Sequence, residues 1–219
     1  MKVLYVPCSS LCSPLPALEE HFSELEPYGS FGLVATAQHL NRLDDVKAFL
    51  ESKGKRVLVG GQILGCSQEN ALKLDADCIL YVGSGRFHPL GVALKTGRPV
   101  FMLNPLSGVL DRISDGERRR WLGRRKAALK RALESQTFGI LVSTKEGQFN
   151  LGKALELKDR LESKGREAFI FAGDELTPGN LLPFRVDCWV NTACPRLSGD
   201  EYNRPVVDSG ELEEFINCL

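Results

Sequence analysis

An internal repeat constrains the fold of this chain more than any other feature of its sequence. Residues 31–59 and 138–171 both open with Phe-Gly and a short apolar run, and both close with Leu-Glu-Ser-Lys-Gly, a basic residue and a second apolar run. Such self-similarity indicates one structural unit used twice. The stretch between the apolar runs has helical periodicity in both copies. Each copy therefore predicts a strand, a helix and a second strand, joined by a right-handed parallel crossover.

Apolar stripes and glycines define the predicted helix of each copy. The stripe residues are Leu43, Val46 and Leu50 in the first copy and Leu151, Ala154, Leu155 and Leu161 in the second. We expect Asn41 to cap the first helix, because its side chain can accept hydrogen bonds from the free N–H groups of a helix start. Gly54 and Gly165 are expected to end the two helices in the left-handed conformation, which glycine adopts without strain.

An Asp-Cys pair followed by an apolar run comes after each copy, at 75–85 and at 185–195. We interpret the matched Cys78 and Cys188 as core residues, because a buried free thiol packs like a small hydrophobe. Further strands are predicted at Lys2–Val6 and Pro99–Leu103.

The predicted fold class is α/β, with two tandem homologous domains (1–112 and 137–219), each a small parallel sheet flanked by helices. A basic helix within 113–136 links them. It carries an apolar stripe, and eight Lys and Arg lie elsewhere on it. We interpret it as a solvated interdomain helix; the alternative is a positive face for an acidic or RNA-bearing partner. The stripe residues are Leu122, Leu129 and Leu133.

The composition is that of a globular protein without a strong general charge. The 219 residues have a formal net charge of +0 and are 43% hydrophobic, so no overall attraction to nucleic acid or to a membrane surface is expected. No apolar run is long enough to span a membrane, and we expect a cytoplasmic protein. The seven cysteines form an odd number, which in a reducing compartment favours buried thiols or metal ligands over disulfides.

Ligands of open parallel α/β sheets bind beyond the carboxyl ends of the strands, which directs attention to the predicted loops at that edge. The richest is VGSGRFHPLG (82–91). Gly83 and Gly85 let backbone approach a ligand closely, Arg86 can pair with a carboxylate or phosphate, and His88 can bond or titrate. The alternative is a tight turn with a surface arginine. The other selected loops are 7–12, 36–39, 61–66, 143–150, 173–175 and 192–198.

Cys66 and Cys194 both fall in these loops. Cys66 follows a glycine-rich turn, and Cys194 stands between Ala193 and Pro195, where proline stops a strand. Two thiolates are too few for a closed zinc site or an iron–sulfur cluster. The chemistry alone therefore leaves open ordinary loop thiols and cluster ligands. Cys8 and Cys12 have C-x3-C spacing, but position 15, where a third cysteine would complete a common cluster motif, is a leucine.

Three stretches of the sequence, and their order, resemble the diphthamide synthase family, the 2-(3-amino-3-carboxypropyl)histidine synthases. These stretches are GQILGC (61–66), VGSGRFHPLG (82–91) and ACPRLSGDEY (193–202). VATAQHL (34–40) and EGQFN (146–150) are also similar to that family, and the likeness covers essentially the whole chain.

The resemblance implies three homologous α/β domains, each contributing one cysteine to a [4Fe–4S] cluster at their junction. It also implies that the cluster binds S-adenosylmethionine, and that reductive cleavage of a carbon–sulfur bond yields a 3-amino-3-carboxypropyl radical. By the same resemblance, this radical is expected to add to one histidine of translation elongation factor 2. By this resemblance, Cys66 and Cys194 are the cluster ligands of the second and third domains. The cofactor-binding candidates are Gln38, His39, Gly83, Gly85, Arg86 and His88.

By this resemblance, we expect the chain to correspond to the second and third domains of that family, without a counterpart of the first domain and its cysteine. A separate polypeptide supplying that domain would make this chain part of a split, multi-subunit enzyme, and a homo- or hetero-oligomer is expected. Alternatively, Cys8 or Cys12 supplies the third ligand. The third reading is a non-catalytic partner subunit or an S-adenosylmethionine-binding module that has lost the cluster. Neither a membrane nor a nucleic acid is expected as a direct partner.

Overall fold

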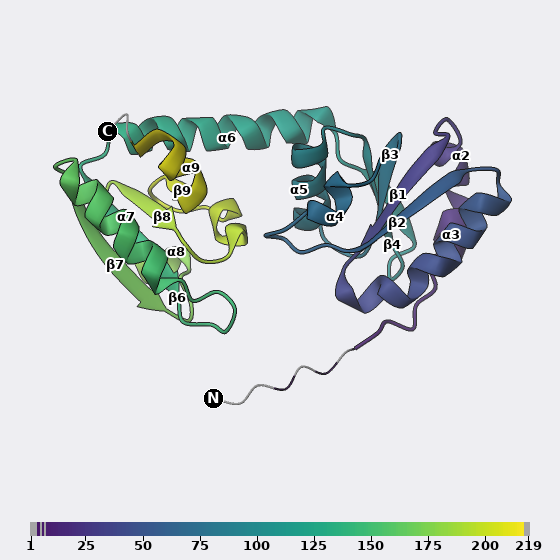
Figure 1. Ribbon diagram of the computed structural model, residues 1–219, viewed down its shortest axis with the longest axis horizontal. Helices are drawn as coiled ribbons and strands as arrows, with labels where there is room; N and C mark the ends of the chain where they lie inside the picture. The colour runs from purple at the N-terminus through teal and green to yellow at the C-terminus, as the bar shows by residue number, and fades with distance from the viewer. Residues whose placement is uncertain (1–3, 5, 7, 217–219) are drawn as a thin grey trace. The chain divides into compact units, whose positions relative to one another are not determined.

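The computed structural model describes residues 4, 6 and 8–216, and the chain forms two compact units, Met1–Arg118 and Arg119–Leu219 (Figure 1). Each unit contains one parallel-rich sheet flanked by helices, as the repeat predicts. The division falls inside a long helix rather than on either side of it. Within the described ranges, no helix is long and apolar enough to cross a membrane.

The first unit is built on a sheet with strand order β2-β1-β3-β4-β5. The first four strands are parallel, and β5 adds an antiparallel edge that the sequence did not predict. Its elements in chain order are α1 (Leu15–Glu20), α2 (Phe22–Leu25), β1 (Ser30–Ala35), the 3₁₀ helix η1 (Ala37–Arg42), α3 (Leu43–Ser52), β2 (Arg56–Gln62), α4 (Glu69–Leu72), β3 (Cys78–Val82), α5 (Phe87–Thr96), β4 (Val100–Asn104) and β5 (Val109–Arg112).

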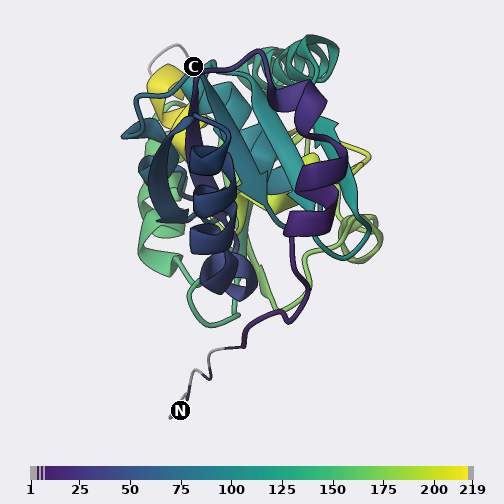
Figure 2. The same cartoon turned by 90° about the vertical axis from the view of Figure 1, so that its right-hand side faces the viewer.

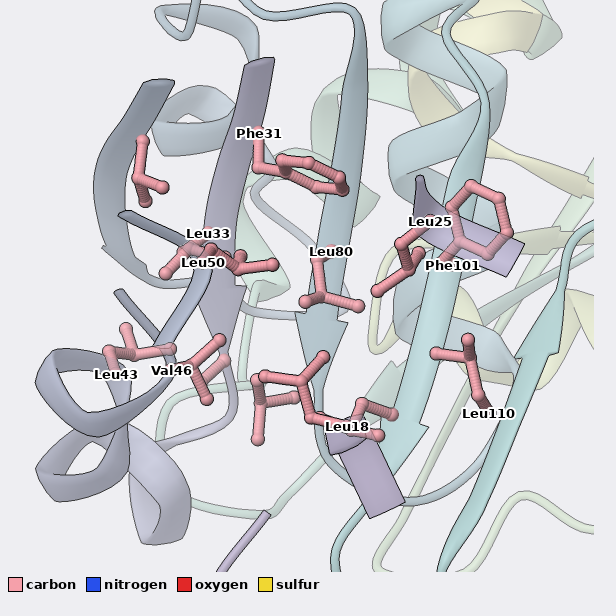
Figure 3. Close-up of a cluster of buried hydrophobic side chains, with 14 of the residues drawn as sticks. Leu18, Leu25, Phe31, Leu33, Leu43, Val46, Leu50, Leu80, Phe101 and Leu110 are labelled. Carbon is pink, nitrogen blue, oxygen red and sulfur yellow. The ribbon is translucent and has the colours of Figure 1, made fainter. Parts of the chain in front are cut away.

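Helices cover both faces of this sheet, because successive side chains of a strand point to opposite faces. Leu33 packs into the cluster formed with α1, α2 and α3, whereas Val34 belongs to the cluster formed with α4 and α5. Figure 2 shows α3 beside the purple N-terminal helices over one face, and Figure 3 shows Leu18, Leu50 and Leu80 within the cluster on that face. The strands of such a doubly covered sheet read as nearly continuous apolar runs.

The second unit has the all-parallel strand order β7-β6-β8-β9. One face of its sheet packs against α6, α7 and α9. On the other face, the strand residues Trp189 and Phe171 pack against Leu176 and Leu181 of the loops and short helices that cover it. The elements are α6 (Asp115–Glu134), β6 (Thr137–Ser143), α7 (Leu151–Ser163), β7 (Glu167–Gly173), α8 (Pro178–Leu181), β8 (Cys188–Asn191), the 3₁₀ helix η2 (Pro195–Gly199), β9 (Val206–Asp208) and α9 (Ser209–Phe215).

The repeat extends from strand order to individual contacts. Phe31 pairs in register with Cys78, and Phe138 pairs in register with Cys188. Both cysteines are fully buried, as predicted. The aspartate before each cysteine accepts hydrogen bonds from backbone N–H groups at the start of the first strand of its unit. The Asp-Cys pair thus joins the first and third strands of each unit.

The helix ends were predicted in part. Gly54 and Gly165 have φ values of 76° and 74° and follow α3 and α7 in the left-handed conformation, which confirms that prediction. The cap at Asn41 was wrong: α3 begins after Arg42, and Asn41 lies inside η1, whose turn already directs the chain into the helix.

Three of the stripe assignments were also wrong. Leu122, Leu151 and Leu155 are 45%, 38% and 47% exposed. In α7 the buried residues are Ala154, Leu157 and Leu161. The helix face that packs on the sheet determines which residues are buried, and Leu155 does not lie on that face. In α6, Ala132 is fully buried and Leu129 packs partly against the second core, so this half of the predicted linking helix belongs to the second unit.

The predicted strand Lys2–Val6 lies largely outside the described residues. Leu4 and Val6, which are described, are exposed and belong to no strand. The strand predicted at Pro99–Leu103 is confirmed as β4.

Candidate functional site

The loops singled out by the sequence lie at the carboxyl ends of the parallel strands in each unit. In the first unit, Gln38 and His39 follow β1, Cys66 follows β2, and the Gly83–His88 loop follows β3. These three strands are parallel neighbours, so the three loops share one edge of the sheet. In the second unit, Cys194 follows β8 at the corresponding edge.

Cys66 is presented on a closed four-residue turn. The N–H of Leu64 donates to the carbonyl of Ser67 (3.0 Å), and the N–H of Ser67 donates back to the carbonyl of Leu64 (3.2 Å). The side chain of Gln68, only 3% exposed, donates from Nε2 to the carbonyls of Leu64 and Gly65. The Cys66 residue itself is exposed. The turn therefore fixes the backbone of this cysteine while leaving the residue open to solvent.

The Cys66 turn packs against the loop after β3. A Cβ placed on Gly65 would lie 2.4 Å from Cε1 of Phe87, so the phenyl ring occupies the space that any other side chain would need. Phe87 begins α5, directly after Arg86. The motifs GQILGC and VGSGRFHPLG are thus in contact. The sequence did not reveal this role of Phe87 or that of Gln68, because an isolated phenylalanine or glutamine carries no local signal of its tertiary contact.

The glycines of the second motif are there for two different reasons. A Cβ on Gly83 would lie 2.6 Å from the hydroxyl of Tyr81, so only glycine fits that position, and Gly85 has a φ of 77°. A pocket of about 220 Å³ opens beside this loop. Its lining includes Gly83, Gly85, Arg86, Asn104, Ser107 and Asp111.

Arg86 is held by acceptors of its own unit. Nε and Nη2 donate to the two carboxylate oxygens of Glu117 at 2.9 Å each, and Nη1 bonds to Asp111. The guanidinium thereby ties the glycine loop to β5 and to the start of α6. A carboxylate ligand would have to replace one of these partners in order to pair with Arg86.

The two histidines at this edge occupy apolar surroundings. Burial lowers the pKa of His39, which is 1% exposed, and of half-buried His88, whose ring stacks on Tyr81 at a centroid distance of 6.3 Å. Burial therefore favours the neutral form of both rings. Neither ring nitrogen of His39 has a hydrogen-bond partner among the described residues. Gln38, by contrast, is exposed.

Cys8 and Cys12 lie on a segment that is anchored to the same edge. The N–H of Ser10 donates to the carbonyl of Gln38 (2.7 Å), and Arg42 donates to the carbonyl of Leu11 (3.0 Å). Cys8 is exposed and Cys12 is partly exposed. The segment is thus placed beside the β1 loop by these hydrogen bonds rather than by the strand that the sequence predicted.

Cys194 lies on a loop whose backbone is also fixed by a carboxamide. Asn191, the last residue of β8 and 3% exposed, donates from Nδ2 to the carbonyl of Cys194 (3.0 Å) and accepts from the N–H of Ala193. The N–H of Leu197 donates to the same Cys194 carbonyl. Cys194 is partly exposed, and it is a loop residue as predicted. The role of Asn191 was not foreseen.

The described cysteines fall into two chemical classes. Burial raises the pKa of the Cys78 and Cys188 thiols to about 12, so both stay neutral. The other four, at positions 8, 12, 66 and 194, reach solvent. Across residues 4, 6 and 8–216, no group of three or more His, Cys, Asp or Glu side chains is arranged to hold a metal ion.

Comparison with known proteins identifies the family. The model described as "Putative diphthamide synthesis protein" matches residues 1–217. The 2-(3-amino-3-carboxypropyl)histidine synthase of Pyrococcus horikoshii is 34% identical over 226 residues, covering 97% of this chain and 65% of that protein. The enzyme of the same name from Methanocaldococcus jannaschii is 33% identical, covering 80% of this chain and 56% of that protein.

The fold gives the same result. The crystal structure of Dph2 from Pyrococcus horikoshii with a 4Fe-4S cluster superposes with a TM-score of 0.84 at 32% identity, covering 96% of this chain and 64% of that one. The chain thus spans less than two thirds of the length of these relatives. The resemblance predicted from the three motifs is confirmed: this chain belongs to the diphthamide synthesis protein family.

Proposed function

We propose that this chain is part of a transferase that moves a 3-amino-3-carboxypropyl group from S-adenosylmethionine to a histidine of translation elongation factor 2, the first step of diphthamide biosynthesis. The observation that carries the proposal is the presentation of Cys66 and Cys194 on fixed loops at the carboxyl ends of parallel strands, in a chain of this family. The relatives named as synthases and the cluster in the Dph2 structure support it.

The donor set fits an iron–sulfur cluster. Thiolate sulfur is the ligand that such clusters take, and Cys66 and Cys194 are accessible to solvent, unlike neutral, buried Cys78 and Cys188. A cluster held by three cysteines would leave one iron open for S-adenosylmethionine. Such a cluster would supply the electron that cleaves the carbon–sulfur bond of S-adenosylmethionine. We propose that the third cysteine comes from the part of these relatives that this chain does not cover; Cys8 or Cys12 is the alternative within this chain.

The pocket beside Gly83 and Gly85 is the proposed place for part of S-adenosylmethionine. Glycine backbone allows close approach of a ligand there, and Asn104 and Ser107 add side chains that can hydrogen-bond to it. Arg86 supports the loop through Glu117 and Asp111. Gln38 and His39 lie on the neighbouring loop after β1, and His88 lies at the start of α5. All three remain candidates for contacts with the cofactor.

Anaerobic reconstitution with iron and sulfide tests the proposal. The wild-type chain would be compared with the Cys66→Ala/Cys194→Ala double variant and with a Cys8→Ala/Cys12→Ala control, each with and without a polypeptide matching the part of the P. horikoshii relative that this chain does not cover. We expect the first pair of substitutions to abolish cluster binding. Loss of binding in the control would assign the third ligand to Cys8 or Cys12.

Two results would overturn the proposal or change it. If the wild type binds no more iron than the Cys66→Ala/Cys194→Ala variant under any of these conditions, the cluster assignment is wrong. If S-adenosylmethionine binds but dithionite reduction releases no methylthioadenosine, the chain is a binding module or partner subunit rather than a catalytic one.

A further inference from the structure

Two buried carboxamides fix the loops that carry the exposed cysteines. Gln68 and Asn191 are each 3% exposed, and they are among the few buried polar residues of the described chain. Each one uses its NH₂ group to bond a backbone carbonyl at, or within two residues of, the cysteine. A carboxamide can do this without carrying a charge or titrating.

Gln68 is held in place from outside the Cys66 turn. Its Nε2 reaches the carbonyls of Leu64 (3.0 Å) and Gly65 (2.9 Å). A Cβ on Gly91 would lie 3.0 Å from the same nitrogen, so a glycine on α5 makes room for the amide. The Cys66 turn thus contacts both the Gln68 amide and the Phe87 ring. Phe87 is a residue of α5, and the Gln68 amide packs against Gly91 of the same helix.

Asn191 belongs to a longer polar network. Besides the Cys194 carbonyl, its Nδ2 bonds Oδ1 of Asp208 (2.9 Å), and Ser198 bonds the same carboxylate oxygen. Arg125 of α6, whose side chain is 16% exposed, pairs with the other oxygen of Asp208. The position of the Cys194 loop is therefore set by three elements of the second unit: β8, β9 and α6.

We propose that Gln68 and Asn191 are positioning residues that preorganise Cys66 and Cys194 as cluster ligands. This inference rests on the proposed function. Groups that bond to the surroundings of a metal ligand hold it in its binding geometry, and their loss typically lowers metal affinity about 10–100-fold. The two tethers do not occupy matched positions of the repeat, because Cys66 follows the second strand of its unit and Cys194 follows the third.

Gln68→Met and Asn191→Leu test the proposal, since each keeps the approximate size of the side chain and removes the donor. If Asn191→Leu does not fold, the smaller Asn191→Ser replaces it. The controls are Asn180→Leu, which loses a carboxamide-to-carbonyl bond to Glu175, and Ser52→Ala, which loses a hydroxyl-to-carbonyl bond to Phe49. Neither bond encloses a segment with a cysteine.

The first measurement uses the protein without iron. Hydrogen exchange at the N–H of Ser67 in Gln68→Met and of Leu197 in Asn191→Leu is expected to accelerate at least about tenfold relative to the controls, because these amides close the two cysteine loops. Unchanged exchange would refute the tether. The second measurement follows iron release from the reconstituted protein into a chelator, which we expect to be about 10–100-fold faster than in the controls.

The outcomes separate this inference from the proposed function. If the loops loosen but iron leaves the variants at the control rate, Gln68 and Asn191 serve the loops alone and the positioning role is refuted. If the wild-type protein itself binds no cluster, the proposed function fails and the positioning role falls with it, before any variant is compared.

Discussion

The two α/β units share a strand order but carry their exposed cysteines on different strands. Cys66 follows β2, the outer strand of the repeated crossover, whereas Cys194 follows β8, which corresponds to β3. In the alignment that matches Cys188 with Cys78, Cys194 corresponds to Ser84 and Arg196 to Arg86. One cysteine position therefore does not predict the other. A parallel sheet tolerates this, because all its carboxyl ends lie at one edge.

The units also differ in how the second face of the sheet is covered. In the first unit, α4 and α5 cover it with aliphatic side chains. In the second, loops and the short helices α8 and η2 do so around the fully buried indole of Trp189. The repeat thus preserves the strands and one helical layer, while loops and short helices packed around a large aromatic ring replace the second helical layer.

Substitution of the matched strand glycines tests this difference with the largest expected effect. A Cβ on Gly139 would lie 2.2 Å from the ring of Trp189, whereas one on Gly32 would meet the flexible ends of Ile79 and Leu74 at 2.6 and 2.8 Å. We expect Gly139→Ala to cost about 3 kcal/mol and Gly32→Ala about 1 kcal/mol, because a rigid ring cannot move aside. Urea unfolding followed by tryptophan fluorescence reports the second unit, since both tryptophans, Trp121 and Trp189, lie there.

Unfolding of the first unit would be followed by amide exchange of β1. Equal costs for the two glycine substitutions would show that Trp189 can shift as easily as Ile79, and the supposed rigidity of the second layer would be wrong.

The arginine clamps of the two units provide a smaller contrast. Arg125 is 16% exposed and pairs with Asp208 and Glu211, whereas Arg86 is 45% exposed and pairs with Asp111 and Glu117. Because solvent weakens exposed ion pairs, we expect Arg125→Met to cost about 2–3 kcal/mol and Arg86→Met at most about 1 kcal/mol. Denaturant midpoints measured by the same two probes check this order. A larger loss of stability at Arg86 would show that the loop contacts of this arginine, rather than the burial of its ion pairs, determine its contribution to stability.

The Asp-Cys pairs should behave alike, with the smallest effect. Hydrogen bonds from Ser30 lower the pKa of Asp77, and hydrogen bonds from Thr137 lower the pKa of Asp187. A lowered folded pKa stabilises the fold above the ordinary value of 3.8, and this stability is lost as pH falls below that value. Asp77→Asn and Asp187→Asn should each flatten the acid branch of the pH–stability curve of their own unit. If the acid branch of the pH–stability curve is unchanged in either variant, other carboxylates are responsible for the acid sensitivity of that unit.

Strands were easier to predict than helix faces. The buried strands β1, β3 and β6 were visible because doubly covered strands form apolar runs. The partly exposed strands β2 and β7 were visible because each closes one copy of the repeat. Leu151 and Leu155 looked like core residues, yet α7 buries Leu157 instead, since several leucine stripes fit one helical period and only packing selects among them. The antiparallel strand β5 (Val109–Arg112) had a single buried residue and gave no periodic signal.

The sequence by itself determined the repeated α/β architecture, the buried Cys78 and Cys188, the strand-end loops with Cys66 and Cys194, and the family. These depend on local patterning and on motifs that are contiguous in the chain. Only the tertiary structure decided that Gln68 and Asn191 fix the cysteine loops, that Phe87 packs on Gly65, and that Arg86 is held by Glu117 and Asp111. Such contacts depend on which residues the packed elements bring within hydrogen-bonding distance, and no local pattern encodes that distance.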